Sequence, residues 1–213
     1  MHIDREKIEQ MPSRQRAAFI NCLSGFKSAN LVGTCDAKGR PNLAIVSSVV
    51  HLGAQPPLLA FISRPPSVER HTLANLTGNG YFTLNHVQLG MIDAAHQTSA
   101  RYPEDVSEFD ATGLTLQYGN LHPAPYVGES HLTIGLALRE ARPIMLNDTV
   151  MVIGEIIEVR VPDNAIGADG FVDLATLQGI VIGGLDGYYQ PQPVCRLAYA
   201  KPDQPPRRLT DLD

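Results

Sequence analysis

The chain has 213 residues, of which 44% are hydrophobic and 18% are charged, and its formal net charge is −5. These values are typical of a globular protein with one sizeable core, so we expect a single domain over residues 1–213. The acidic balance, without a basic stripe, argues against nucleic acid or a membrane surface as a partner. No apolar run approaches the roughly 20 residues of a membrane span, and the first residues lack a signal-peptide core, so we expect a cytoplasmic protein.

Residues 4–25 predict a helical segment in two pieces, divided at Met11-Pro12. Ser13 is in the position of a cap for the second piece. The apolar residues of that piece are expected to face a core: Ala17, Ala18, Ile20, Cys22 and Leu23.

After Lys27 the apolar period changes to two. Residues 31–35 and 41–52 predict a hairpin, because the turn at 36–39 ends in a glycine that can adopt positive φ. Strands are expected at 57–63 and 80–87, a short helix at 88–96, and an irregular loop at 98–110.

Two longer strands are predicted further along, at residues 132–139 and 150–161. In the second strand we expect Ile153, Ile157, Val159 and Val161 to share one face. A short helix is expected at 173–177, and a poorly packed, proline-rich tail after Tyr199. Antiparallel strands with brief helices predict a mainly β protein, a barrel with peripheral helices.

The cysteines and histidines predict no covalent framework and no metal site. Cys22, Cys35 and Cys195 are widely spaced and odd in number, so we expect no disulfide and interpret them as buried apolar residues. The seven histidines form no ligand pattern of the kind that holds zinc.

The segment after the strand at 57–63 has the features of an anion site. The prolines Pro65 and Pro66 end the strand, and Ser67 is in the position of a helix N-cap. Backbone N–H groups at the helix start and four side chains would converge on one phosphate: Arg64, Ser67, Arg70 and Thr72. The alternative from these residues is a pair of solvated arginines beside an ordinary helix cap.

Several spaced motifs, together covering about residues 28–189, resemble the flavin reductase-like family, whose members bind FMN on a split β-barrel. The hairpin motifs at 30–34 and 39–44 are followed by Ser47-Ser48 and Pro56-Pro57. The loop at 64–75, Asn85 at a strand end, and the motif at 98–103 with Glu108-Phe109 continue the similarity. A glycine-rich element at 182–184, with Tyr188 and Tyr189, ends it. His71 departs from the family pattern, which often has an acid there, so its role is left open.

The resemblance implies an FMN-binding split β-barrel and an NAD(P)H-dependent flavin oxidoreductase. Hydride would pass from NADH or NADPH to FMN, and no dedicated acid–base residue is required. Arg64, Ser67, Arg70 and Thr72 would hold the phosphate. The other cofactor contacts would come from Ser47, Ser48, Asn85, Ser99, Ala100 and Tyr102.

A homodimer is also implied, with FMN near the subunit interface, and a redox partner protein is possible. Two alternatives remain open. One is a flavoredoxin-like electron carrier, and the other is a flavin-binding protein without nicotinamide turnover. The candidate residues have structural alternatives too. Ser47 and Ser48 could satisfy backbone groups, Asn85 could close a turn, and Tyr102 could pack its loop.

Overall fold

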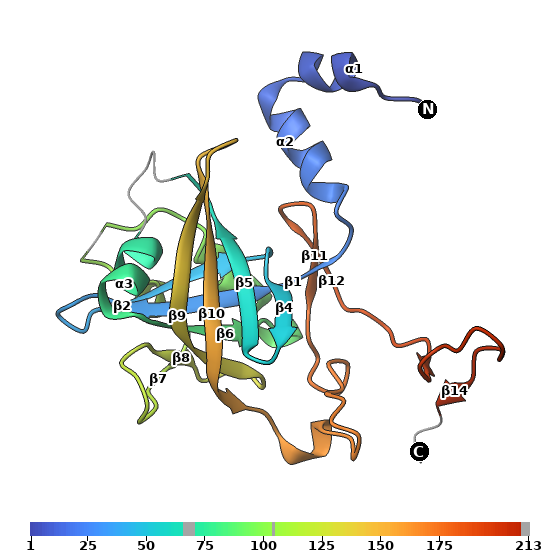
Figure 1. The fold of residues 1–213 in the computed structure, drawn as a ribbon. Helices are drawn as coiled ribbons and strands as arrows, with labels where there is room; N and C mark the ends of the chain where they lie inside the picture. The colour runs from blue at the N-terminus through green and yellow to red at the C-terminus, as the bar shows by residue number, and fades with distance from the viewer. Residues whose placement is uncertain (66–70, 104, 210–213) are drawn as a thin grey trace.

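The computed structural model describes residues 1–65, 71–103 and 105–209. Within these residues, the largest element is a seven-stranded antiparallel sheet in the order β3-β2-β6-β9-β10-β5-β4 (Figure 1). Its strands are β2 (Asn30–Cys35), β3 (Pro41–Val46), β4 (Val50–Ala54), β5 (Pro57–Ser63), β6 (Tyr81–His86), β9 (Thr133–Ile144) and β10 (Thr149–Arg160). The predicted mainly β fold is therefore confirmed.

The sheet curls until its two edges meet. β3 and β4 are at opposite edges, yet only residues 47–49 separate the end of β3 from the start of β4. So short a connection requires the two edge strands to be close together, so the sheet is bent into a barrel that is open along one seam. Register shifts at Ile153/Gly154 and Ile156/Glu158 of β10 add local twist.

Smaller elements surround the barrel. A three-stranded sheet has the order β1 (Lys27–Ser28), β11 (Val181–Gly183) and β12 (Gly187–Tyr189). Two short ribbons complete the strands. One pairs β7 (Leu116–Gln117) with β8 (Tyr126–Val127), and the other pairs β13 (Arg196–Leu197) with β14 (Arg208–Leu209). The helices are α1 (Arg5–Gln10), α2 (Ser13–Cys22), α3 (His71–Asn79), η1 (Leu89–Met91), α4 (Ile92–Gln97), α5 (Glu108–Thr112) and η2 (Asp163–Ala165). In the described part of the chain, no helix has the length and apolar character that crossing a membrane requires.

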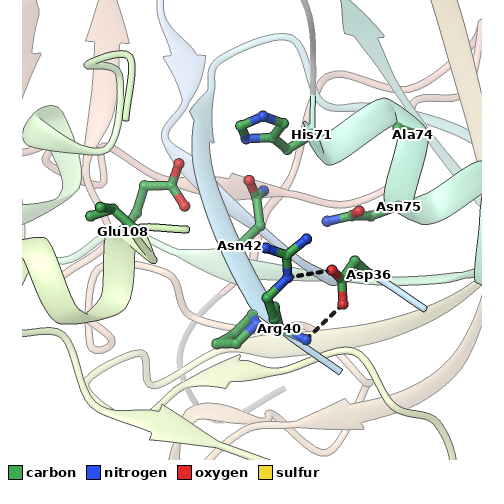
Figure 2. Close-up of a pocket in the computed structure, with 9 residues that line it drawn as sticks. Asp36, Arg40, Asn42, His71, Ala74, Asn75 and Glu108 are labelled. Atoms are coloured by element: carbon green, nitrogen blue, oxygen red, sulfur yellow. Dashed lines mark hydrogen bonds and ion pairs between the residues drawn. The ribbon is translucent and has the colours of Figure 1, made fainter. Parts of the chain in front are cut away.

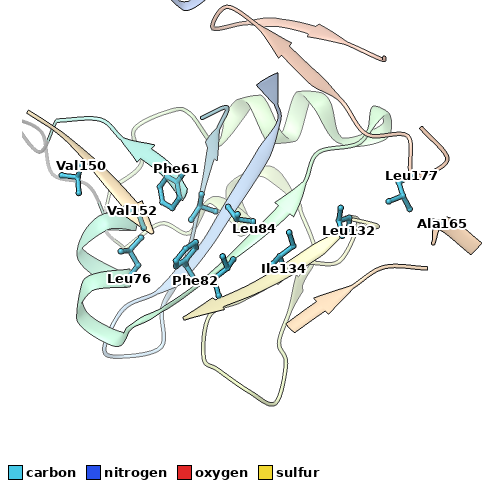
Figure 3. Packing of buried hydrophobic residues seen from close by; sticks show 12 residues of the cluster. Phe61, Leu76, Phe82, Leu84, Leu132, Ile134, Val150, Val152, Ala165 and Leu177 are labelled. Carbon is cyan, nitrogen blue, oxygen red and sulfur yellow. The ribbon is translucent and has the colours of Figure 1, made fainter. Parts of the chain in front are cut away.

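The barrel interior holds the larger hydrophobic cluster (Figure 3). The rings of Phe61 and Phe82 meet edge to face with centroids 5.6 Å apart, and Leu76 of α3 belongs to the same cluster. β10 has Gly154 at this point, because a Cβ atom there would overlap the Phe82 ring. Each large apolar side chain buried here contributes roughly 1.5–3 kcal/mol.

A second cluster lies against other elements. It joins Leu31 of β2 and Leu43 of β3 to Ala95 of α4, Phe109 of α5 and Ile182 of β11. Both clusters use β2, all six residues of which are buried. β2 therefore supports two layers at once, which explains why it has no exposed position.

The predicted hairpin at β2 and β3 is confirmed, with Gly39 at φ 79° in the turn. The strands at 57–63, 80–87, 132–139 and 150–161 and the helix at 88–96 are also found, although β9 extends to Ile144. The predicted strand at 41–52 is divided in two at residues 47–49. The loop predicted at 98–110 includes the start of α5.

The N-terminal arm, defined here as residues 1–26, differs from the sequence prediction. Both helices are present, but neither contains a buried residue, and the arm extends away from the barrel (Figure 1). Ser13 lies inside α2, whose N-cap position is Pro12. The expected core face is wrong, because all of its residues are exposed: Ala17, Ala18, Ile20, Cys22 and Leu23.

Three further expectations need correction. In β10 the buried positions are Val150, Val152 and Gly154, whereas Ile157 and Val159 are exposed, so the face that points to the core begins with the even-numbered residues and not with Ile153.

Residues 173–177 form turns instead of a helix. The Asp173 carboxylate accepts hydrogen bonds from the N–H groups of Ala175 and Thr176, which holds a local turn. Of the cysteines, Cys35 is buried as expected, but Cys22 and Cys195 are exposed.

Candidate functional site

The β3–β4 connection puts two serines at the barrel seam. Ser48 Oγ accepts a hydrogen bond from the Ile62 N–H at 2.9 Å and donates one to the Ile62 carbonyl oxygen at 3.2 Å. These bonds attach the connection to β5, so Ser48 has a structural role. Ser47 is half-buried, and its side chain makes no hydrogen bond to any described residue. Of the two serines, Ser47 is the one whose hydroxyl is available to a ligand.

The predicted phosphate loop follows β5. Arg64 is exposed at its start, whereas Ser67 and Arg70 lie outside the described residues. Thr72 is in the first turn of α3, and its hydroxyl oxygen accepts a hydrogen bond from Asn42 Nδ2 at 2.9 Å. Arg64 and Thr72 therefore bracket the strand-to-helix junction, as the sequence predicts.

A polar network attaches α3 to the barrel. Asn42 Nδ2 also lies 3.2 Å from Thr34 Oγ1, and Asn75 Nδ2 donates to the same oxygen at 3.3 Å. β2, β3 and α3 each contribute a side chain to this network. Because both amides are held by partners on the sheet, the start of α3 is fixed in orientation relative to the barrel.

The network borders a cavity of about 110 Å³ next to the start of α3 (Figure 2). Glu108 lies on one side of it and Asp36 and Arg40 on the other, with Asn42 between them and His71 above. The cavity thus combines amide, guanidinium, imidazole and carboxyl groups beside the start of α3, but neither Arg64 nor Thr72 of the predicted phosphate site is among the residues that line it.

The carboxyl groups of Asp36 and Glu108, which both line the cavity, have different hydrogen-bond donors. Asp36 accepts hydrogen bonds from the Arg40 backbone N–H at 2.8 Å and from Arg40 Nε at 2.6 Å, and these bonds lower its pKa. Glu108 is buried, and burial raises its pKa, although a hydrogen bond from the Leu43 N–H at 2.9 Å opposes that shift. The Asp36 carboxylate is therefore paired with a guanidinium, whereas the hydrogen bond to the Glu108 carboxyl group comes from a backbone N–H.

Asn85 has a structural role in this fold. It is fully buried, and its Nδ2 donates to the Leu31 carbonyl at 3.1 Å and to Thr83 Oγ1 at 2.9 Å. Its Oδ1 accepts a hydrogen bond from the Val127 N–H at 3.0 Å. These bonds join β2, β6 and β8, and the full burial of the side chain supports its structural alternative.

The end of α4 carries the remaining candidates. Ser99 and Ala100 are exposed just after the helix, and the Tyr102 hydroxyl accepts a hydrogen bond from Gln97 Nε2 at 2.9 Å. His96 Nδ1 lies 2.8 Å from the Tyr188 hydroxyl of β12. The structure therefore brings His96 of α4, two residues before the motif at 98–103, into contact with Tyr188, which follows the glycine-rich element.

The curled sheet with its open seam is a split β-barrel, and the strand-to-helix junction at one end of β5 is its candidate anion site. The chain belongs to the flavin reductase-like family, since residues 23–177 match the family described as Flavin reductase like domain. The resemblance found in the sequence is therefore confirmed.

Three individual proteins illustrate the similarity. A split-barrel protein of Shewanella frigidimarina NCIMB 400, assigned as a flavin reductase, is 52% identical, with a TM-score of 0.91 over 94% of this chain and 100% of that one. The flavoredoxin of Desulfovibrio vulgaris (Miyazaki F) is 26% identical, with a TM-score of 0.70 over 84% and 92%. An uncharacterized protein of Deinococcus radiodurans is 24% identical over 150 residues, 68% of this chain but only 64% of that protein.

The donor chemistry of the junction fits a phosphate-bearing flavin. Arg64 supplies a cation, the Thr72 hydroxyl a donor, and the amide network holds α3 in a fixed position. The sequence reasoning did not assign Asn42, Asn75 or Glu108 to the site. All three stand within motifs noted in the sequence, but no spacing rule indicates that a β3 amide and an α5 carboxyl meet at α3.

Proposed function

We infer that the protein binds FMN and catalyses hydride transfer from NADH or NADPH to the flavin. The observation that carries this proposal is the strand-to-helix junction bracketed by Arg64 and Thr72, in a member of the flavin reductase-like family. The family supports a flavin-dependent oxidoreductase. The phosphate-directed chemistry of the junction favours FMN over riboflavin, which has no phosphate.

In this proposal the residues divide into two groups. Arg64, Ser67, Arg70 and Thr72 neutralise and bind the phosphate through charge-assisted hydrogen bonds. Ser47 at the seam and Ser99, Ala100 and Tyr102 after α4 contact the rest of the cofactor. Bound flavin supplies the hydride acceptor, and the chain's own residues orient the rings and exclude water, so no dedicated acid or base is assigned.

A flavoredoxin-like electron carrier is the second candidate. The similarity to the Desulfovibrio flavoredoxin favours it, and the sequence has no strand-linked G-x-G-x-x-G motif that would identify a nicotinamide site. Such a carrier would take electrons from a redox partner protein. Both candidates share the flavin site and differ only in what delivers the electrons.

A homodimer is part of the same proposal. The arm exposes Leu23 and Phe26, which are 62% and 68% accessible, and neither packs into the barrel's own core. Large apolar side chains of this kind are typical of subunit interfaces. A cytoplasmic location stays a prediction.

Flavin affinity tests the site. FMN and riboflavin are titrated by fluorescence quenching against the wild type, Arg70→Ala and, as a control, Arg139→Ala, whose arginine is exposed and paired with Glu155 on the sheet. We expect FMN to bind more tightly than riboflavin, and Arg70→Ala to weaken FMN binding at least tenfold, which corresponds to about 1.4 kcal/mol. Equal affinities for the two flavins would contradict the phosphate site.

Turnover separates the two candidates. The FMN-loaded protein is mixed with NADH or NADPH, and bleaching of the visible flavin absorption is followed. Rapid bleaching by either nucleotide supports the reductase. A protein that binds FMN but is bleached only by dithionite, a chemical reductant, is the electron carrier.

A further inference from the structure

A second cavity lies at the other end of β10. Its volume is about 370 Å³, within the range of about 300–1,000 Å³ that small-molecule sites occupy. Val150 at the start of β10 pairs with Ser63, next to Arg64, whereas Arg160 at its end pairs with Thr133. From residue 150 to residue 160 an extended strand covers about 33 Å at roughly 3.3 Å per residue. The cavity is therefore separate from the candidate flavin site.

Arg160 is the cation of this cavity, and it is held in place before any ligand arrives. Its Nε and Nη2 lie 3.2 and 3.1 Å from Glu158 Oε1, and its guanidinium carbon lies 3.9 Å from the centroid of the Tyr126 ring. The Tyr126 hydroxyl in turn donates to Glu158 Oε2 at 2.6 Å. Nη1 makes no hydrogen bond within the described residues. A fixed guanidinium with unused donors loses little side-chain entropy when it binds.

Thr133 provides an independent observation. It lines the same cavity, is 4% exposed, and its hydroxyl has no hydrogen-bond partner among the described residues. Buried hydroxyl groups nearly always have a partner, and one without a partner is expected where a ligand or another missing group supplies it. Gln117 and His131 add further polar side chains to the lining.

The remaining wall is apolar, formed by the Tyr126 ring, Val127, Val161 and Pro162. Among the described residues the lining includes no carboxyl side chain, and the adjacent Glu158 carboxylate is held by Arg160 and Tyr126. Because Arg160 already shares its charge with Glu158, the cavity suits a single carboxylate at the unused Nη1 donors better than a polyanion. A ligand with one carboxylate on an apolar body would match both the polar part of the cavity, at Arg160, and its apolar wall.

We propose that this cavity binds a small organic monocarboxylate, with the carboxylate at Arg160 Nη1 and the apolar body against the wall formed by Val127, Val161 and Pro162. The site is independent of the flavin chemistry, because it uses β7, β8 and the end of β10 instead of the α3 junction. It adds a second ligand class to a protein whose first proposed ligand is a flavin.

Benzoate is the probe that tests this site. Its binding to the full chain is measured by isothermal titration and saturation-transfer NMR, and we expect saturable binding with a Kd on the order of 1 mM. Benzyl alcohol, which keeps the ring and lacks the charge, is expected to bind at least tenfold more weakly. Equal binding of the two compounds, or no saturation by benzoate, would overturn the proposal.

Variants locate the site. Arg160→Gln should weaken benzoate binding at least tenfold, and Thr133→Val, which keeps the side-chain shape, about threefold. The matched control is Arg139→Gln, because Arg139 also pairs with a β10 glutamate but lies outside the cavity. Its benzoate affinity should equal that of the wild type.

Arg160→Gln also removes the contact with Tyr126, so its thermal midpoint is recorded beside its affinity. If it is poorly folded, Thr133→Val and amide shifts near Val161 decide the question. Equal benzoate affinity in all variants, or benzoate-induced amide shifts confined to β5 and α3, would mean that benzoate binds elsewhere and would refute the site.

Discussion

The barrel and the N-terminal arm differ in whether their apolar residues are buried. All six residues of β2 are buried between neighbouring strands and covering helices, whereas neither α1 nor α2 contains a buried residue. Within the barrel, residues of the same chain cover the apolar side chains of β2, whereas no described residue of the chain covers those of the arm to the same extent. The contrast indicates that barrel stability is a property of one chain, whereas the arm adds no buried core of its own. In the proposed homodimer the second subunit would supply the surface that the arm lacks.

Two phenylalanines provide the sharpest test of this contrast. Phe82 is fully buried against Phe61, and Phe26 is 68% exposed beside Tyr189, with ring centroids 4.8 Å apart. We expect Phe82→Ala to lower the free energy of unfolding by about 3–5 kcal/mol, and Phe26→Ala by less than about 0.5 kcal/mol at concentrations where the protein is monomeric. Chemical denaturation measures both. Similar losses in the two variants would mean that the arm packs as part of the core.

The pH dependence of stability should also come from the barrel. Burial lowers the pKa of His86 in β6 from 6.5 to about 4. Below pH 6.5 the unfolded chain binds a proton that folded His86 does not bind until about pH 4, so stability falls as the pH decreases through this window, by up to roughly 3 kcal/mol.

His86→Gln should flatten this slope, in part only, because burial also lowers the pKa of His122. The matched control in the arm is His2→Gln, since His2 is exposed. Denaturation midpoints between pH 4 and 7 measure the effect. A slope that His2→Gln changes as much as His86→Gln would contradict the assignment to β6.

Self-association should depend on the arm. The double variant Leu23→Ser with Phe26→Ser removes two exposed apolar side chains, and we expect the dimer dissociation constant to rise at least tenfold, which is about 1.4 kcal/mol. Sedimentation velocity measures it, with and without FMN. The control is Leu121→Ser, which changes an equally exposed leucine outside the arm. A wild-type chain that sediments as a monomer at all concentrations would exclude the dimer.

The smallest effect concerns the start of the arm. The Asp4 carboxylate accepts a hydrogen bond from the Lys7 N–H at 3.0 Å and caps α1. Asp4→Ala should destabilise this helix by about 1 kcal/mol, yet leave the global unfolding midpoint unchanged because α1 buries nothing. Far-ultraviolet circular dichroism reports the helix, and near-ultraviolet signals report the barrel. A lowered global midpoint would show that the arm and barrel unfold together.

The strands were predictable because alternation and turn chemistry are local properties. The β2–β3 hairpin, for example, follows from apolar runs on both sides of a turn with Gly39 at positive φ. Burial was less predictable. A sequence indicates that residues such as Ile20 share a helix face, but it does not specify whether the same chain provides a surface for that face.

The candidate site was predictable in part. Arg64 and Thr72 could be found because a strand end, two prolines and a helix start are adjacent in the sequence. The amides of Asn42 and Asn75 could not, because their meeting depends on how α3 docks on β2 and β3. Asn85 shows the reverse problem, since a polar residue at a strand end has the same pattern whether it binds a ligand or the backbone.

The pairing of β1 with β11 has a consequence for biosynthesis. Lys27 pairs with Ile182, so the first strand of the chain has its partner near the other end. A ribosome must therefore have synthesised the chain past residue 182 before this sheet can form, and a contact of such long sequence separation closes slowly. Until then the edge of β1 and the neighbouring Ala29 and Leu31 lack part of their cover. The nascent chain should accordingly depend on chaperones longest at its N-terminal end, although that end is made first.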